Sequence, residues 1–259
     1  MLTDGLAAQA RQESNKVSDF SRRTKDIKTL QGKIVAVTGG FGQLGQAVMF
    51  AARDAGAQVA ALDRALAPAE ATLPAGTFAL GELDLAEPDA AVRALDQVAA
   101  RFGGLDALVN VAGAFRWETL EKGSLETWDL LYRVNLRSAV STSRAALPHL
   151  MRRGGGRIVN IGAGAAAAKA SAGMGAYTAS KAGVAKFTEV LAEELKDRNV
   201  TVNAVLPSTI DTPANRVDMP NADFSRWVTP QAIADVIVFL LSGQARAVTG
   251  ALIPVSGRV

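Results

Sequence analysis

A tyrosine and a lysine stand four positions apart in the segment Tyr177-Thr178-Ala179-Ser180-Lys181. On a helix this spacing places both side chains on one face. A nearby ammonium favours the phenolate and lowers the pKa of a tyrosine from its usual value of about 10. A tyrosine tuned in this way can exchange a proton with a carbonyl or alcohol oxygen. Alone, the pattern is more typical of a solvated helix face, so its meaning depends on the rest of the chain.

A glycine-rich turn earlier in the chain supports a catalytic interpretation of the Tyr177–Lys181 pair. Residues Thr38 to Gly45 read T-G-G-F-G-Q-L-G and follow a short apolar run, Ile34 to Val37. Such glycines permit a tight turn and let the backbone approach a pyrophosphate at the start of the next helix. The turn therefore predicts a nicotinamide dinucleotide site on a Rossmann-type domain.

An acidic residue stands where such a site needs one. Asp63 ends the next apolar run and lies 63 − 45 = 18 residues after Gly45. That is close to the spacing of the carboxylate that holds the ribose 2′-hydroxyl. A carboxylate there repels a 2′-phosphate, so NAD is favoured over NADP. The neighbouring Arg64 weakens this preference, and NADP stays possible.

Short apolar runs alternate with helical patterns from Lys33 onward. We expect strands at 34–37, 58–62, 77–83, 107–110, 157–161, 201–206 and 251–255, and helices ending near 55 and over 88–102, 125–151, 175–197 and 230–242. This alternation predicts an α/β fold: a doubly wound parallel sheet of Rossmann type in three layers, α/β/α. We expect one domain over 32–259, preceded by a partly disordered N-terminal extension over 1–31.

Composition excludes several function classes. The formal net charge is only +3, and no long basic stripe stands out, so nucleic-acid binding is not indicated. There is no cysteine and one histidine, His149, which leaves almost nothing for thiol, Ser-His-Asp or His-based metal chemistry. The uncharged stretch 34–52 contains four glycines and is interpreted as strand, loop and helix, so no membrane span is expected. With no secretory signal visible, we expect a cytoplasmic protein.

The chain resembles the short-chain dehydrogenase/reductases over about residues 31–259. The resemblance rests on the glycine loop, Asp84-Leu85, Asn110-Val111-Ala112-Gly113, Asn135 and Tyr177-x-x-x-Lys181. It implies an oxidoreductase that moves a hydride between the nicotinamide and a small carbonyl or alcohol, imine or quinonoid substrate. It also implies a homo-oligomer, a tetramer or dimer, packed through the 125–151 and 175–197 helices.

The resemblance assigns roles residue by residue. Tyr177 would be the general acid/base, Lys181 would hold the nicotinamide ribose, and Asn135 would support a proton-relaying water. The remaining implied cofactor contacts are Gly39, Phe41, Gly42, Gln43, Leu44, Gly45, Asp63, Arg64, Asp84, Leu85, Asn110, Ala112, Gly113, Ile161, Pro207, Thr209, Ile210 and Thr212. No metal is implied.

The chain departs from the family where the substrate oxygen would be bound. The usual serine falls 13 or 14 residues before the tyrosine, but 161–165 reads I-G-A-G-A and has no hydroxyl. Three interpretations stay open. The substrate needs only Tyr177, as in the dihydropteridine reductases, which this stretch resembles; another group such as Ser171 supplies the hydroxyl; or the chain binds cofactor with little turnover, as a sensor or assembly subunit.

Other segments carry weaker expectations. Gln43 replaces a glycine of the common loop, and Pro207-Ser208 replaces a Pro-Gly pair. Residues 211–227 are expected to form a lid over the substrate, with part of it packed as an apolar cover. Arg116 and Trp117 are candidates for binding a carboxylate and a ring of the substrate, or form an ordinary surface loop. Arg152 and Arg153 are expected at a solvated helix end, and His149 in a packing role.

Overall fold

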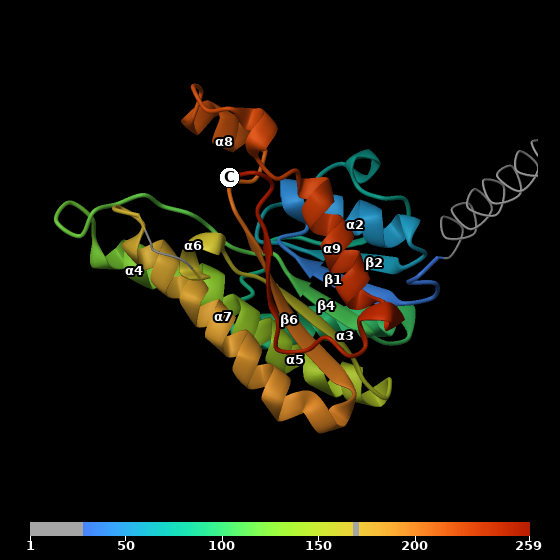
Figure 1. Ribbon diagram of the computed structural model, residues 1–259. Helices are drawn as coiled ribbons and strands as arrows, with labels where there is room; N and C mark the ends of the chain where they lie inside the picture. The colour runs from blue at the N-terminus through green and yellow to red at the C-terminus, as the bar shows by residue number, and fades with distance from the viewer. Residues whose placement is uncertain (1–27, 168–170) are drawn as a thin grey trace, which may run out of the picture.

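The computed structural model describes residues 28–167 and 171–259 and places them in a seven-stranded parallel sheet covered by helices on both faces (Figure 1). The strand order is β3-β2-β1-β4-β5-β6-β7. The strands are β1 (Ile34–Thr38), β2 (Gln58–Leu62), β3 (Phe78–Leu80), β4 (Ala107–Asn110), β5 (Gly156–Ile161), β6 (Val200–Pro207) and β7 (Leu252–Val255). The expected α/β fold class, with its doubly wound sheet and three layers, is confirmed.

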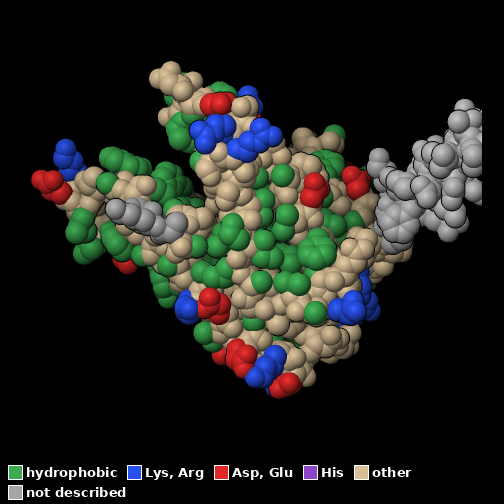
Figure 2. Space-filling view, viewed as in Figure 1, with side chains coloured by type: hydrophobic (Ala, Val, Ile, Leu, Met, Phe, Trp, Pro, Cys, Tyr) green, Lys and Arg blue, Asp and Glu red, His purple; other side chains and the backbone are tan. Residues whose placement is uncertain are grey.

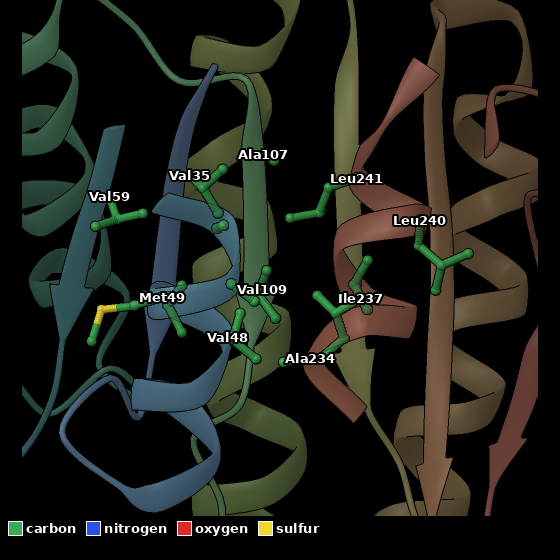
Figure 3. Close-up of a cluster of buried hydrophobic side chains, with 14 of the residues drawn as sticks. Val35, Val48, Met49, Val59, Ala107, Val109, Ala234, Ile237, Leu240 and Leu241 are labelled. Carbon is green, nitrogen blue, oxygen red and sulfur yellow. The ribbon is translucent and has the colours of Figure 1, made fainter. Parts of the chain in front are cut away.

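Helices pack on the two faces in separate groups. The helices are α2 (Gln43–Asp54), α3 (Pro88–Phe102), α4 (Leu125–Leu131), α5 (Ser138–Arg152), α6 (Gly164–Ala167), α7 (Gly175–Leu195), α8 (Pro213–Asp218) and α9 (Pro230–Leu241), with short helical turns at Glu70–Thr72, Lys196–Arg198, Phe224–Arg226 and Gly243–Ala245. One core joins α2 and α9 to the sheet, and Figure 3 shows its side chains. A second core joins α3, α5 and α7 to the opposite face. The central strands β1 and β4 are buried at every position, so they read as continuous apolar runs.

The expected 125–151 helix contains a break. The chain forms a π-helix over Tyr132–Arg137, between α4 and α5. A π-helical turn widens the backbone spiral and often occurs at functional sites. Here it carries Asn135, whose side chain is 1% exposed. The apolar pattern predicts a single helix because the chain stays helical through the π-turn, with α4 directly before it and α5 directly after it.

The start of the domain also differs slightly from expectation. Residues 28–31, expected in the extension, belong to the domain: Leu30 is 1% exposed, and its N–H donates to the Ala55 carbonyl at 2.9 Å. The rest of the expected extension, residues 1–27, lies outside the described residues. In the described part of the chain, every helix is too short or too polar to cross a bilayer.

Close packing defines the turn between β1 and α2. Gly39 adopts a φ of +64°, and a Cβ there would lie 2.8 Å from the Ala112 nitrogen. A Cβ on Gly45 would lie 2.1 Å from the Gly39 carbonyl oxygen. By contrast, Gln43 begins α2 as an exposed residue, so the side chain that replaces the family's glycine meets no obstacle. The turn therefore needs glycine at 39 and 45 and not at 43.

Gly45→Ala and Gly42→Ala form a matched pair that tests this packing. A Cβ on Gly45 must displace the Gly39 backbone, and such overpacking costs about 2 kcal/mol or more, so we expect Tm to fall by roughly 4–8 °C. A Cβ on Gly42 would meet the nearest atom at an ordinary 3.5 Å, and its φ of −76° suits alanine. Gly42→Ala should therefore leave Tm unchanged or slightly higher. Equal melting temperatures for the two variants, measured by circular dichroism, would contradict the packing.

Candidate functional site

A cleft of about 450 Å³ opens where the carboxyl ends of the strands meet, between β1 and β4. The strand order reverses at this point, which is where open α/β sheets bind their ligands. Nine of the residues expected to contact the cofactor line this cleft: Gly39, Phe41, Gly42, Asp63, Arg64, Asp84, Leu85, Ala112 and Gly113. Sequence reasoning missed Ala65, Leu83, Ala86, Val111, Val134 and Ser138, which also line it but carry no distinctive chemistry.

Asp63 joins the glycine turn to the end of β2. One carboxylate oxygen accepts the N–H of Phe41 at 3.0 Å, and the other accepts the N–H of Ala65 at 3.0 Å. Each oxygen keeps a lone pair that can accept a further hydrogen bond. Asp63 is half-buried, whereas Arg64 beside it is exposed.

Asp84 is paired with Arg133, a basic side chain of the π-helix. Its carboxylate accepts from Arg133 at 2.8 Å and from the N–H of Ala86 at 3.1 Å. Burial raises the pKa of Asp84, but these two hydrogen bonds and the charge of Arg133 together bring the pKa below its usual value. Asp84 is therefore a carboxylate at neutral pH, and its Leu85 neighbour is buried at 5% exposure.

The Asn110 side chain is bonded inside the protein and does not line the cleft. Its carboxamide donates to Ser143 and Asn160 at 3.0 and 2.8 Å and accepts from Thr142 at 2.7 Å. With these bonds made and the residue 3% exposed, the side chain is occupied inside the sheet. The backbone after it lines the cleft, held by the bond from the Ala112 N–H to the Thr38 hydroxyl at 3.1 Å.

Tyr177 and Lys181 lie near the start of α7, as their spacing predicts. The Lys181 ammonium donates to the Ile161 carbonyl at 2.7 Å. A Cβ on the cleft residue Gly113 would lie 3.3 Å from the Lys181 Nζ, so the ammonium lies directly beside the cleft. The edge of the Phe115 ring packs on the Tyr177 ring, with centroids 5.0 Å apart.

The pKa values of this pair differ from the sequence-based expectation. Burial raises the pKa of Tyr177 to about 12, whereas we expected the ammonium to lower it. The reason is that the Lys181 ammonium is directed to the Ile161 carbonyl, which leaves desolvation as the dominant effect on the phenol. Burial also lowers the pKa of Lys181 to about 8.

The π-helix directs Asn135 onto the backbone that follows the cleft. The Asn135 carboxamide accepts the Ala114 N–H at 2.7 Å and donates to the Ala114 carbonyl at 3.1 Å. It also donates to the Ser180 hydroxyl at 2.9 Å, which in turn donates to the Tyr177 carbonyl at 2.7 Å. Sequence reasoning missed Ser180, although it lies within the Tyr177–Lys181 segment. Asn135 thus fixes the loop beside the tyrosine.

The stretch without the family's serine is closely packed. A Cβ on Gly162 would lie 2.3 Å from a Leu206 methyl, and one on Gly164 would lie 3.3 Å from the Pro207 carbonyl oxygen. Between them, Ala163 is 4% exposed and already carries a Cβ. Ala163 is therefore the position of the three where a hydroxyl needs the least rearrangement. Ser171 lies exposed in the loop before α7.

We expect part of the segment after β6 to pack as an apolar cover, and in the structure only its end is buried. Only Trp227 of its large apolar residues is buried, while Val217 and Met219 are 78% and 40% exposed. The α8 segment projects from the body, and Figure 2 shows the surface hollowed between it and the arm that leads into α4. The Arg216 guanidinium donates two hydrogen bonds to the Asp211 carboxylate, at 2.6 and 2.8 Å, and these join α8 to the residues before it. The exposed α8 segment leaves the hollow open.

The expected nicotinamide contacts lie at the base of this segment. Thr209 and Ile210 are fixed by backbone pairing with Val228, and the Thr212 hydroxyl oxygen caps α8 by accepting the Asn215 N–H at 3.2 Å. These residues, Pro207, Ile161, Asn135, Tyr177 and Lys181 do not line the 450 Å³ cleft itself, nor do Gln43, Leu44, Gly45 and Asn110.

Three other expectations have clear structural outcomes. Trp117 uses its indole N–H to bind the Ala172 carbonyl at 3.1 Å while its ring stays 63% exposed. His149 is buried and lies 2.9 Å from Asp96, consistent with a packing role. Arg153 is not simply solvated, because it contacts the buried carboxylate of Asp106 at 3.3 Å.

Known proteins resemble this arrangement in sequence and structure. The chain is 30% identical to a 3-oxoacyl-(acyl-carrier-protein) reductase FabG of Thermotoga maritima over 88% of this chain and 98% of the relative. It is 34% identical to a D-beta-hydroxybutyrate dehydrogenase of Rhizobium meliloti over 82% of this chain and 84% of the relative. The ligand-free aldohexose dehydrogenase of Thermoplasma acidophilum superposes with a TM-score of 0.80 at 27% identity, covering 90% of this chain and 95% of that one.

A family model supports the same assignment. The model described as short chain dehydrogenase matches residues 33–222, which span the glycine turn, the cleft and the Tyr177–Lys181 pair. The chain therefore belongs to the short-chain dehydrogenase family of nucleotide-binding oxidoreductases.

Proposed function

We propose that this protein is a reductase that uses NADH in preference to NADPH and acts on a small carbonyl, imine or quinonoid substrate, with Tyr177 as the proton donor. The observation that carries the proposal is the position of the Tyr177–Lys181 pair. The Lys181 ammonium lies beside Gly113, which lines the same cleft as the glycine turn.

The cleft fits a dinucleotide in its shape and its hydrogen-bonding groups. The turn at Gly39 and Gly45 has no room for a side chain, so its backbone can approach a pyrophosphate closely. The start of α2 adds N–H groups and the positive end of a helix dipole. The free lone pairs of Asp63 would accept the ribose hydroxyls, and its charge would repel a 2′-phosphate. The bound nicotinamide would supply the hydride.

Tyr177 suits reduction because it is protonated throughout the neutral range. Burial holds its pKa at about 12, so its hydroxyl is a donor and not a base at pH 7. A positioned hydroxyl can donate to the substrate oxygen as negative charge develops there. Lys181, charged below its pKa of about 8, would hold the nicotinamide ribose through its ammonium.

The substrate is expected to require one hydroxyl donor rather than two. Residues 161–165 supply no hydroxyl, and Gly162 and Gly164 leave little space for one. A quinonoid or otherwise activated substrate needs less stabilisation of a developing oxyanion than a simple ketone does. The absence of the serine therefore favours an activated substrate.

Removing the Tyr177 hydroxyl tests the proposal. The protein is incubated with NADH or NADPH and a panel of ketones, quinones and quinonoid dihydropterin, and absorbance of the reduced cofactor is followed. We expect Tyr177→Phe to lower kcat by about 100-fold or more, since general acid catalysis contributes 10²–10⁴. Tyr132→Phe, at the chain's other tyrosine, which is 55% exposed, is the matched control and should stay active. Tight NADH binding without turnover of any substrate would contradict the proposal and favour a cofactor-binding role.

The pH dependence tests the role of Lys181. Because the buried ammonium has a pKa of about 8, kcat/KM for reduction should be level at lower pH and fall as the pH rises through about 8. Tyr177 does not contribute to this decline because it loses its proton only near pH 12. Lys181→Arg keeps its charge through this range, so any activity that remains should lack the decline. A wild-type profile that stays level up to about pH 10 would show that the charge on Lys181 is not required.

Restoring the family's hydroxyl tests whether its absence limits the reaction. Ala163→Ser adds one oxygen at a buried position that already holds a Cβ. A second donor to an oxyanion contributes roughly 100- to 1,000-fold in rate, so reduction of simple ketones should increase by at least tenfold. Activity with quinonoid substrates should change less. A decrease with every substrate would show instead that the pocket needs the space at Ala163.

A further inference from the structure

A second cavity lies at the opposite edge of the sheet from the dinucleotide cleft. It has a volume of about 170 Å³ and opens where β1, β4 and β5 begin. Its apolar wall includes Val35, Ala107 and Leu241, which Figure 3 shows together near the starts of β1 and β4 and the end of α9. Its polar wall includes Lys33, Asp106, Arg153 and Arg157. The cavity shares no lining residue with the cleft described above.

Positive charge exceeds negative charge in this cavity. Three basic side chains line it, and Asp106 is the only acidic residue among its lining residues. The Asp106 carboxylate is already well occupied, because it accepts the Ile34 N–H at 3.0 Å and contacts Lys33 at 3.4 Å and Arg153 at 3.3 Å. One carboxylate therefore faces three cations, which leaves a net charge of +2.

Arg157 lacks an acidic partner among the described residues. One terminal guanidinium nitrogen donates to the carbonyl of the neighbouring Gly156 at 2.8 Å, and the buried Nε has no partner. Burial lowers the pKa of Arg157, which shows that its charge is poorly solvated. A half-buried guanidinium without a counter-ion is costly, and such groups commonly indicate an ion or water that completes the site.

A second unpaired group lies beside Arg157. Arg157 and Thr201 are direct partners in the β5–β6 register, so their side chains leave the sheet on the same face. Thr201 is 7% exposed, and its hydroxyl oxygen also has no hydrogen-bond partner. Two neighbouring strands thus contribute unpaired polar groups at the same place, next to a cationic cavity.

We propose that this cavity binds a small oxyanion, a phosphate group or a carboxylate, with Arg157 as its principal ligand. A guanidinium can present two parallel N–H groups to such an anion, and Lys33 and Arg153 would add charge at the cavity mouth. An anion of charge −1 or −2 would neutralise the excess of positive charge. The site lies at the starts of the strands, so its ligand is separate from the pyrophosphate of the dinucleotide.

Binding to the folded state predicts a saturable rise in stability. Thermal unfolding and titration calorimetry are carried out with saturating NADH, so that the glycine turn is not available to the added anion. Inorganic phosphate and acetate are compared with chloride at equal ionic strength. We expect saturable binding with a Kd of about 1 mM or tighter for at least one of the two anions. The tighter of the two identifies the ligand as a phosphoryl or a carboxyl group.

Variants separate this site from general salt effects. Arg157→Gln should weaken binding by about tenfold or more, since it removes a charged donor. Lys33→Gln, at a side chain that is 53% exposed, is expected to fold normally and to weaken binding to a smaller extent, so it serves if Arg157→Gln proves unstable. Arg93→Gln, on the exposed face of α3, is the matched control and should bind as the wild type does.

Two results would overturn the proposal. The first is the absence of saturable binding of either anion at about ten times the expected Kd. The second is an increase in Tm that grows without saturation and is equal in the wild type, Lys33→Gln and Arg93→Gln, because exclusion of phosphate from the protein surface stabilises any fold in that way. Neither result depends on catalytic turnover, so this experiment tests the anion site independently of the proposed reductase activity.

Discussion

The hydrogen bond from the Phe41 N–H to the Asp63 carboxylate is the contact on which the dinucleotide cleft depends. It fixes the turn after β1 against the end of β2, while Gly39 packs on the backbone at Ala112 that follows β4. Three strand ends therefore meet around one glycine turn. Because this packing leaves no room for side chains, the backbone itself forms the surface that faces the ligand.

A second set of contacts connects this surface to Tyr177, the proposed proton donor. Asn135 pairs with both backbone groups of Ala114, one residue beyond the cleft, and continues through Ser180 to the Tyr177 carbonyl. The π-helical turn places Asn135 where it can make these bonds. The cleft and the Tyr177–Lys181 pair are thus held in one rigid arrangement, whereas the α8 segment beyond them stays exposed.

The positions of most strands were predictable, because strands buried inside a parallel sheet need continuous apolar runs. The third strand is shorter than expected, Phe78–Leu80 instead of 77–83, since Glu82 adopts a left-handed φ of 58° that ends the extended backbone. The glycine turn and Asp63 were recognisable from spacing alone. Contacts between distant residues were not, and so the roles of Ser180, Arg153 and Arg157 and the raised pKa of Tyr177 emerge only from the folded structure.

A fluorescence titration of the wild type and Asp63→Asn with NADH and NADPH tests directly whether the Asp63 carboxylate selects the cofactor. Asparagine keeps the size of the side chain and an acceptor for the Phe41 N–H but removes the charge that would repel a 2′-phosphate. We expect the wild type to bind NADH about tenfold or more tightly than NADPH, and Asp63→Asn to lose most of this preference. Equal affinity of the wild type for the two cofactors, or a preference that Asp63→Asn leaves unchanged, would contradict this expectation.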